Sequence, residues 1–463
     1  MEADYLVVGS GASSMSFVDT MLDESDATFV MIDDRPAPGG HWNDTYPFVR
    51  LHQPACTYGV ASRPLGSMRV ETRGTNRGLL ELSSGPEIVR YYHALMREKF
   101  LASGRVQFHP MATWNGQNGF VSRLSGARHD VTVRRKIVEG THLTTRIPMT
   151  QPPNFAIAPG VTCEPINHVP RLAADHPHIT VLGAGKTGID CLVWLLEQGY
   201  PADAITWVMP RASWFWNRDR LQPAPEFFLT TIGGQADTLE ACGVASSVDD
   251  LALRMEACGM WLRLDEEEWP TLYHAATVTH ADLELLRRVK DVVRLGRVEA
   301  LEPERMILQQ GEVVARPDTL YVNCTASAVE GNVGDRTPTF SEGRIALNML
   351  RVYQPCFSSA LIAHLEAGSF DEETRAAMTR PAPMTDTVTD WLSSQAATLR
   401  DQAAWSADED VSAWVRGCRL DNGHHLLQRF DGSDEAQAAA LGRMLAATRP
   451  AVENLERLAG AVH

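Results

Sequence analysis

Apolar runs of strand length alternate with segments of helical character at the start of the chain. Residues 5–8 (Tyr-Leu-Val-Val) form the first run, a helix-compatible segment follows from residue 12, and residues 29–32 form a second run that ends at Asp33. Short, continuous apolar runs bounded by polar residues are typical of buried parallel strands. The pattern therefore predicts a strand, a helix and a second, parallel strand.

The same pattern occurs again in the middle of the chain. Residues 179–182 form an apolar run, helical periodicity extends to Gly199, and residues 204–209 form the next run. Strands that alternate with helices in this way favour an α/β fold built on parallel sheets. Apolar periodicity also predicts helices over three further segments: 86–103, 247–264 and 281–294.

Glycine residues lie at the first strand–helix turn. Four residues there would face a bound phosphate: Gly9, Gly11, Ala12 and Ser13. Glycine allows a tight turn and the close approach of a pyrophosphate to the helix N-terminus, and an acid after the second strand accepts from the adenosine ribose. Asp33 occupies that acidic position, whereas Ser14 stands where the pattern has its third glycine. We expect Ser14 to loosen the contact between helix and strand without blocking the phosphate.

The second turn carries the complete glycine pattern, in five residues: Gly183, Gly185, Lys186, Thr187 and Gly188. The strand that follows does not end in an acid, and Arg211 lies in the corresponding region. An arginine there pairs with the 2′-phosphate of NADPH, which a carboxylate would repel. NADPH is therefore predicted in preference to NADH; the alternative is that Arg211 is a solvated loop residue. The two turns together predict two Rossmann-like dinucleotide-binding domains.

Two glycines and a tryptophan follow the first unit, in the segment Gly39-Gly40-His41-Trp42. With this segment the chain resembles the two-dinucleotide-domain flavoproteins. It is most similar to the class B flavin-dependent monooxygenases, which include N-hydroxylases, flavin-containing monooxygenases and Baeyer–Villiger enzymes. The resemblance covers roughly residues 3–365 and implies FAD as the resident cofactor, with Gly40, His41 and Trp42 lining the flavin.

The next segment, residues 46–54, is similar to a Tyr-Pro-Gly-x-Arg-x-Asp segment that lies against the flavin in Baeyer–Villiger enzymes. Here Phe48 stands in place of the glycine and His52 in place of the acid. The resemblance implies that Arg50 or Gln53 contacts the flavin, and Arg50 and His52 are the candidate catalytic residues. A histidine titrates near neutral pH, so His52 is a candidate proton donor or acceptor. A structural ion pair or hydrogen bond is the alternative for these residues.

Domain boundaries follow from the proline-rich stretch around residues 150–160 and from the buried strand expected at residues 319–326. In the related flavoproteins the chain returns to the FAD domain at the latter point, which places Thr325 near the cofactor. A helix then starts at Pro355, with its N-terminus towards the flavin. The predicted parts are a FAD-binding domain, an NADPH-binding domain with a helical insertion, and a helical C-terminal region: 1–159 with 319–365, 160–318 with the insertion at 213–294, and 366–463.

Composition narrows the classes of partner. The chain has 463 residues and a net charge of −16, which argues against nucleic acid or an anionic membrane as a partner. The eight cysteines are scattered without a CxxC pair, so neither a zinc site nor a disulfide framework is expected. There is no basic leader and no apolar run of about 18 residues, as a membrane span requires. These features predict a cytoplasmic protein, with a homodimer as one expected assembly.

The resemblance implies a reaction in two stages. NADPH bound at Gly183–Gly188 reduces the flavin, and reduced flavin reacts with dioxygen to give a C4a-(hydro)peroxyflavin that oxygenates a small organic substrate. Nitrogen, sulfur and carbon all stand as the oxidised atom. Three alternatives remain open: a flavin reductase or dehydrogenase without oxygen transfer, a flavin halogenase, and a non-enzymatic flavoprotein. The C-terminal region is open as a cap, a dimer face or a pocket lid.

Overall fold

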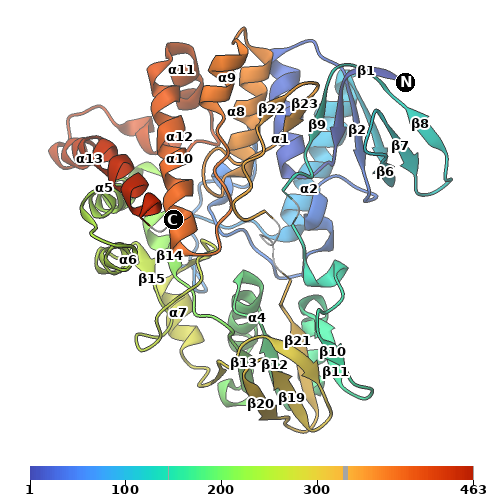
Figure 1. Cartoon of the computed structure of the whole chain (residues 1–463), viewed down its shortest axis with the longest axis vertical. Helices are drawn as coiled ribbons and strands as arrows, with labels where there is room; N and C mark the ends of the chain where they lie inside the picture. The colour runs from blue at the N-terminus through green and yellow to red at the C-terminus, as the bar shows by residue number, and fades with distance from the viewer. Residues whose placement is uncertain (144, 327–331, 462–463) are drawn as a thin grey trace.

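The computed structural model describes residues 1–143, 145–326 and 332–461, which form a mixed α/β fold. Figure 1 shows a first sheet near the N-terminus, a second sheet at the far end of the long axis, and a helical part that contains the C-terminus. Within these ranges no helix has the length and apolar character needed to cross a membrane. The same ranges contain no cluster of three or more His, Cys, Asp or Glu side chains suited to a metal ion.

The first sheet has the strand order β22-β23-β9-β1-β2-β5. Strands β1 (Glu2–Val8) and β2 (Phe29–Asp33) pair in parallel, and α1 (Ala12–Glu24) connects them. The first predicted strand–helix–strand unit is therefore confirmed. The remaining strands of this sheet come from distant parts of the chain: β5 (Val106–Pro110), β9 (Thr132–Glu139), β22 (Phe340–Ser341) and β23 (Arg344–Ala346).

Both faces of the first sheet are covered. Alternate β1 residues point to opposite faces: Tyr5 and Val7 pack against the helices, whereas Leu6 packs with Phe120 of a small antiparallel sheet. This burial explains the continuous apolar run in β1. The helices are α1, α2 (Gly85–Leu95) and α8 (Pro355–Ala367), and the small sheet consists of β6 (Ala112–Trp114), β7 (Gly119–Ser122) and β8 (Arg128–Asp130). A short hairpin, β3 (Gly59–Val60) and β4 (Arg63–Pro64), lies near α1 and α8.

The second sheet is parallel throughout and has the order β11-β21-β12-β13-β17. Strands β12 (His178–Leu182) and β13 (Ile205–Val208) flank α4 (Lys186–Glu197), which confirms the second predicted unit. The other strands are β11 (Thr162–Pro165), β17 (Asp291–Val293) and β21 (Thr319–Asn323). A further sheet packs on it: β10 (Ala156–Ile157), β18 (Val298–Leu301), β19 (Arg305–Leu308) and β20 (Gly311–Val314).

Sequence-based boundaries are wrong at several points. The helix expected over 247–264 ends at Ala257, because Trp261 and Leu262 pair with Trp216 and Phe215 as a strand. Strand β21 pairs with β12 and β11, so the chain leaves the second sheet after Asn323 and not at residue 319. The helix expected over 281–294 is limited to α7 (His280–Leu286), because Val292 and Val293 pair with β13 as strand β17. Tertiary pairing overrides the apparent helical spacing there, since both valines are β-branched and suit a strand.

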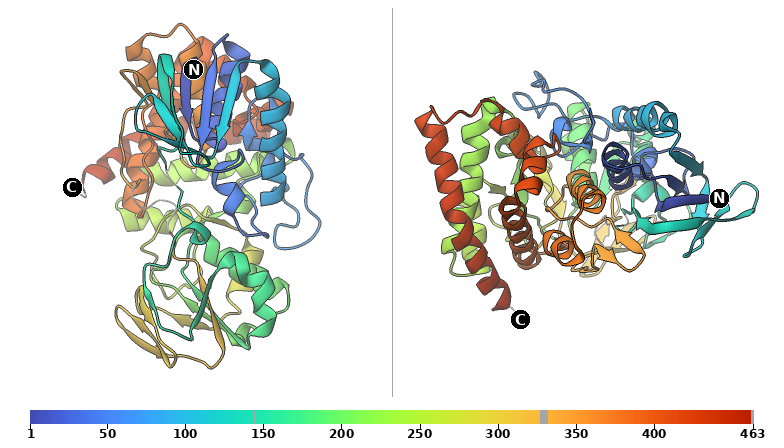
Figure 2. Two further views of the ribbon diagram at one scale, coloured as in Figure 1. Left: turned by 90° about the vertical axis from the view of Figure 1, so that its right-hand side faces the viewer. Right: turned by 90° about the horizontal axis from the view of Figure 1, so that it is seen from above.

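The helical part combines the insertion after β13 with the C-terminal region. Figure 2 shows α13 (Glu435–Gly460) alongside α5 (Phe228–Val244), which is a helix of the insertion. Asn454 Nδ2 of α13 donates to the Cys242 and Ala245 carbonyl oxygens at 2.7 and 2.8 Å. The remaining helices are α3 (Val169–Leu172), α6 (Val248–Ala257), α9 (Glu372–Met378), α10 (Val388–Ala407), α11 (Glu409–Gly417) and α12 (Asn422–Leu426).

A three-stranded sheet completes the insertion: β14 (Phe215–Asn217), β15 (Trp261–Leu262) and β16 (Thr277–Val278). Next to it, Trp391 of α10 packs on Trp261 and Tyr273, with ring centroids 5.1 and 5.8 Å apart. The C-terminal region is helical, as predicted, and the last two residues of its predicted range lie outside the described residues. It belongs to the same apolar core as the insertion.

Ser14 is accommodated by a glycine that the opening motif does not contain. A Cβ atom on Gly140, just after β9, would lie 1.8 Å from Ser14 Oγ and 2.9 Å from the Val8 carbonyl oxygen. The helix and the sheet therefore stay in close contact although the third motif glycine is absent. The expected loosening does not occur, because the Ser14 side chain occupies the space that is left by the lack of a side chain at Gly140.

We predict that Gly140→Ala destabilises the protein by about 1–3 kcal/mol, the usual cost of overpacking. The added methyl group must displace Ser14 or the carbonyl of Val8. In the double variant Ser14→Gly/Gly140→Ala the clash with Ser14 is removed, so part of the loss is recovered. Urea denaturation of the single and double variants measures both effects. Equal stability of the two variants would contradict this account of the α1–β9 contact.

Candidate functional site

The first glycine turn joins β1 to α1 in a conformation that requires glycine. Gly9 has φ +92°, and a Cβ atom there would lie 2.9 Å from the Thr141 side chain. Among the described residues no acceptor bonds the backbone N–H groups of Ala12, Ser13 and Ser14. Free N–H groups at a helix N-terminus carry partial positive charge and favour an anion. This end of α1 is therefore suited to a phosphate.

The second pair of glycines crosses directly over this turn. Gly39 N–H donates to the Ser10 carbonyl oxygen at 2.8 Å. Gly40 has φ +56°, and a Cβ atom on it would lie 2.9 Å from the Gly11 Cα. The sequence separates these two segments by a helix and a strand, and the fold brings their backbones into contact. Only glycine at position 40 permits this approach.

Asp33 ends β2 beside the same turn. Its Oδ2 accepts from the Ser10 N–H at 2.6 Å and from the Ser10 hydroxyl at 2.8 Å, and its Oδ1 accepts from the Arg35 N–H at 2.8 Å. A carboxylate has about four acceptor positions, so one remains on Oδ1 for a ribose hydroxyl. Asp33 thus holds the turn in shape and keeps the capacity that the sequence assigns to it.

The second glycine turn has the same construction at the end of β12. Gly183 has φ +113°, and a Cβ atom on it would lie 2.7 Å from the Cys324 carbonyl oxygen. A Cβ atom on Gly188 would lie 2.2 Å from the Gly183 carbonyl oxygen, so the third glycine is required here. The first N–H groups of α4, on Lys186, Thr187 and Gly188, again have no acceptor in the described part of the chain.

Lys186 links the second glycine turn to the segment that follows the first. Its ammonium group forms an ion pair with Asp190, whose Oδ2 also accepts from the Tyr46 hydroxyl at 2.5 Å. Burial is the main cause that lowers the pKa of Lys186, and Asp190 opposes it. Two residues beyond Tyr46, Phe48 stacks on Trp194 of α4 with ring centroids 4.9 Å apart. Phe48 therefore has a packing role between the two units.

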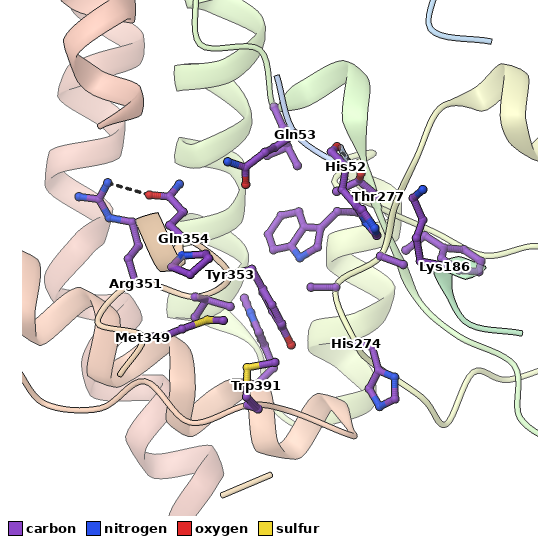
Figure 3. Close-up of a pocket in the computed structure, with 18 of the residues that line it drawn as sticks. His52, Gln53, Lys186, His274, Thr277, Met349, Arg351, Tyr353, Gln354 and Trp391 are labelled. Carbon is purple, nitrogen blue, oxygen red and sulfur yellow. Dashed lines mark hydrogen bonds between the residues drawn. The ribbon is translucent and has the colours of Figure 1, made fainter. Parts of the chain in front are cut away.

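A cavity of about 1660 Å³ lies between the two sheets and the helical part. Most sequence-predicted site residues line it: His41, Trp42, Arg50, His52, Gln53, Gly183, Gly185, Lys186, Thr187, Arg211 and Thr325. The others lie outside its lining: Gly9, Gly11, Ala12, Ser13, Asp33, Gly40 and Gly188. Figure 3 shows side chains around this space that come from distant parts of the chain: His52, Gln53, Lys186, Met349, Tyr353 and Gln354. Such a volume exceeds the 300–1,000 Å³ typical of a single small-ligand pocket.

Arg50 is engaged in an ion pair. Its guanidinium binds Glu71, with Nη1 3.1 Å from Oε2, and Nη2 donates to the Leu82 carbonyl oxygen at 2.9 Å. The ion-pair alternative is thus realised, although the side chain still lines the cavity. Gln53 donates only a long hydrogen bond, 3.5 Å, to the Thr57 carbonyl oxygen.

His52 lies in the cavity wall among cations. Burial, followed by the nearby charges of Lys186 and Arg218, holds its pKa well below the ordinary value. The imidazole is therefore neutral at pH 7, and the expectation that it titrates near neutrality is wrong. The cause is tertiary, since both cations come from the second unit and its insertion. A neutral His52 can still accept or donate a hydrogen bond.

His41 is a second histidine with a depressed pKa. Burial, together with the charge of Arg35, lowers its pKa to about 4. Its ring stacks on Trp42 at 5.2 Å, and the Trp42 Nε1 donates to the Tyr58 hydroxyl at 2.8 Å. The two residues thus form a neutral aromatic wall of the cavity.

We expect the stability of the protein to fall as the pH is lowered from about 6.5 to 4. The unfolded chain binds a proton on His41 over this range and the folded protein does not, so acid favours unfolding. In His41→Gln this part of the pH dependence is lost. Thermal denaturation between pH 4 and 8 compares the variant with His93→Gln, an exposed histidine on α2. An unchanged pH slope in His41→Gln would contradict the assignment.

Arg211 forms an ion pair with a residue of the C-terminal region. Its Nη1 and Nη2 each donate to the Asp386 carboxylate at 2.7 Å, and His274 Nε2 lies 2.9 Å from the same carboxylate. The hydrogen bonds from Arg211 lower the pKa of Asp386 to about 2, so the acid is ionised. A phosphate on Arg211 therefore competes with Asp386. Arg211 is thus a paired residue and not simply a solvated loop residue, and its binding of a 2′-phosphate stays a prediction.

The residues just before α8 complete the cavity, and the glycine motifs did not indicate them. Arg351 pairs with Asp421, lies over the Phe357 ring at 4.1 Å and donates to Gln354 at 3.2 Å. Tyr353 has φ +57°, rare for a bulky residue. The predicted helix start at Pro355 is confirmed, and it lines the cavity. In the sequence, Pro355 was the only sign of this part of the cavity, because it indicated the start of the helix.

No protein-family model matches the chain. Two proteins, the uncharacterized protein Rv2000 of Mycobacterium tuberculosis (strain ATCC 25618 / H37Rv) and its counterpart Mb2023 of Mycobacterium bovis, are each 41% identical over 420 residues. The alignments cover 91% of this chain and 78% of those proteins. The chain belongs to the family of these mycobacterial proteins.

Solved structures similar to the chain include several flavin monooxygenases. The polycyclic ketone monooxygenase of Thermothelomyces thermophila is 11% identical, with a TM-score of 0.49 over 98% of this chain and 88% of that one. A cyclohexanone monooxygenase mutant from Rhodococcus sp. Phi1, bound to NADP+, is 12% identical, with a TM-score of 0.46 over 97% and 98%. A cadaverine monooxygenase from Erwinia amylovora, bound to FAD, is 13% identical, with a TM-score of 0.44 over 80% and 95%.

Proposed function

We propose that the protein is a FAD-containing, NADPH-dependent monooxygenase of small organic molecules. The observation that carries the proposal is that segments following both glycine turns line one cavity: His41, Trp42 and Gln53 after the first, and Gly183, Lys186 and Thr187 at the second. Two nucleotides bound at the two turns would meet in this space. Hydride transfer between a nicotinamide and a flavin requires such a meeting.

The residues of the first unit fit a bound FAD. The contact between Gly11 and Gly40 leaves room only for backbone, which favours a close approach of a pyrophosphate. Free N–H groups begin α1, and Asp33 retains one acceptor position. The proposed FAD domain comprises residues 1–155 and 324–365, because β10 pairs with β18 of the second part and β21 ends at Asn323, and the proposed NADPH domain comprises the segment between them.

Bound FAD would supply the redox chemistry, accepting a hydride from the nicotinamide and activating dioxygen. The side chains of this chain orient and enclose the reacting groups. His41 and Trp42 form an uncharged wall that excludes water, and the start of α8 presents its positive end to the cavity. In balance, NADPH, a proton, dioxygen and the substrate give NADP+, water and the oxygenated product.

The test follows the flavin spectrum of the purified protein and its consumption of NADPH and dioxygen. Oxidised protein is reduced with NADPH without oxygen and then mixed with dioxygen in a stopped-flow spectrometer. A monooxygenase gives a transient visible band different from those of oxidised and reduced flavin, and consumes dioxygen with NADPH. Reduction of an artificial electron acceptor without dioxygen uptake would instead identify a reductase. A protein that is colourless as purified would refute the proposal.

A further inference from the structure

The helical part forms one wall of the cavity. We term the part of the cavity next to this wall the helical chamber. Its lining comes from α5, α10 and α13, and Leu239, Trp391, Thr398 and Met444 are representative members. Every residue that these three helices contribute to the lining is uncharged. Their charged residues pair with one another elsewhere, as Arg443 of α13 does with Asp237 and Glu240 of α5. The three helices therefore contribute an uncharged wall to the cavity.

Three glutamines stand out in this wall. Gln235 of α5 and Gln395 and Gln402 of α10 line the cavity, and all three are half-buried. None of their side-chain amides bonds to another of the described residues, and the Thr398 hydroxyl and the Trp391 Nε1 also have no partner among them. Residues 395, 398 and 402 lie on one face of α10, since positions three and four apart on a helix are neighbours. A bound molecule can therefore meet two free amides on one helix face.

The carboxylates that reach the cavity are already neutralised. Among the described lining residues the acids are Asp386 and Asp421, and each is paired with an arginine, Arg211 and Arg351 respectively. A substrate ammonium group would have to break one of these pairs. Transfer of a charge into an uncharged, partly apolar compartment is also costly without a partner. The wall formed by α5, α10 and α13 thus offers no charged partner to a cation or an anion, although other parts of the cavity lining carry arginines, Arg416 of α11 among them.

We propose that the chamber binds the substrate of the monooxygenase and that this substrate is a neutral, mainly apolar molecule with a ketone or hydroxyl oxygen. The inference rests on the proposed function. An amide donates to a ketone and both donates to and accepts from a hydroxyl, so Gln395 and Gln402 match such a molecule. Leu239, Met444 and Trp391 cover its apolar body. An amine substrate, which is protonated at neutral pH, is excluded by the same chemistry.

Binding of three probes of equal chain length tests the proposal: 2-dodecanone, dodecylammonium and dodecanoate, each below its micelle concentration. Titration calorimetry is used with oxidised protein and no NADPH, so that no turnover occurs. The ketone is expected to bind at least about tenfold more tightly than either charged probe. Equal or tighter binding of dodecylammonium, or no binding of the ketone, would overturn the assignment.

Gln395→Glu places a carboxylate in the chamber and sharpens the test. The variant should bind dodecylammonium at least about tenfold more tightly than the wild type, and the ketone less tightly. Gln310→Glu, in the exposed turn between β19 and β20, adds the same charge outside the cavity and should change nothing. Gln402→Glu serves as a second variant if the first does not fold. Unchanged probe preference in a folded Gln395→Glu or Gln402→Glu variant would refute the chamber.

The outcomes separate this inference from the proposed function. Selective ketone binding by a protein that consumes NADPH without dioxygen would leave the chamber intact and remove the monooxygenase proposal. A transient oxygen-dependent band in a protein that prefers dodecylammonium would support the monooxygenase proposal and remove the proposed substrate class.

Discussion

Gly40→Ala is expected to be purified with at least about tenfold less flavin than the wild type. The added Cβ atom would lie 2.9 Å from the Gly11 Cα, at a backbone φ of +56° that alanine rarely adopts. The segment 39–42 must then move away from the first glycine turn, which widens the proposed pyrophosphate site and shifts His41 and Trp42. The ratio of visible to ultraviolet absorbance after purification measures the flavin content.

Gly104→Ala is the matched control. Gly104 also has a positive φ, +70°, but a Cβ atom there has no neighbour within 4 Å. The control therefore carries backbone strain of a similar kind, about 1 kcal/mol, without the collision. It should keep its flavin. A Gly40→Ala protein as yellow as the wild type would show that the crossing of residues 39–40 does not support the cofactor.

The second large effect concerns the nucleotide preference. Arg211→Ala should raise the KM for NADPH by about tenfold or more and that for NADH by less than about twofold, because a charge-assisted hydrogen bond contributes roughly 1.5–3 kcal/mol. Asp386→Asn should do the reverse and lower the KM for NADPH, since it releases Arg211 and removes a negative charge beside the phosphate. Steady-state kinetics with both nucleotides measures these changes.

Arg316→Ala provides the control for this pair. Arg316 pairs with Asp291 on the second sheet and does not line the cavity. Its loss should leave both KM values unchanged. If Arg211→Ala weakens NADPH and NADH equally, the 2′-phosphate lies elsewhere. Arg297, which lines the cavity and has no carboxylate partner among the described residues, would then be the next candidate.

Local patterns predicted the two strand–helix–strand units because their information is local. The largely apolar runs of four residues before Gly9 and before Gly183 specify a buried strand, and the glycines specify the turn. In the segment Gly40–Trp42, His41 and Trp42 line the cavity, and their contact with a flavin stays a prediction. The sequence alone was sufficient to predict structure where the contacts lie within one strand–helix–strand unit.

Contacts between distant segments were beyond the reach of these patterns. The partner of Arg211 is Asp386, which lies in the C-terminal region, and Gly140 compensates for Ser14 across the first sheet. The depressed pKa of His52 depends on its burial and on Lys186 and Arg218, which belong to other parts of the chain. Neither charge pairing nor packing at such separation leaves a periodic signal in the sequence.

Anaerobic reduction by NADPH tests the central claim most directly. Flavin-bound protein is mixed with increasing NADPH without oxygen, and the visible flavin absorbance is followed with time. Two nucleotides that meet in one cavity, as we propose, predict loss of this absorbance at a rate that saturates with NADPH. Flavin that stays oxidised at saturating NADPH would mean that the nicotinamide and the flavin do not meet, and would contradict the account.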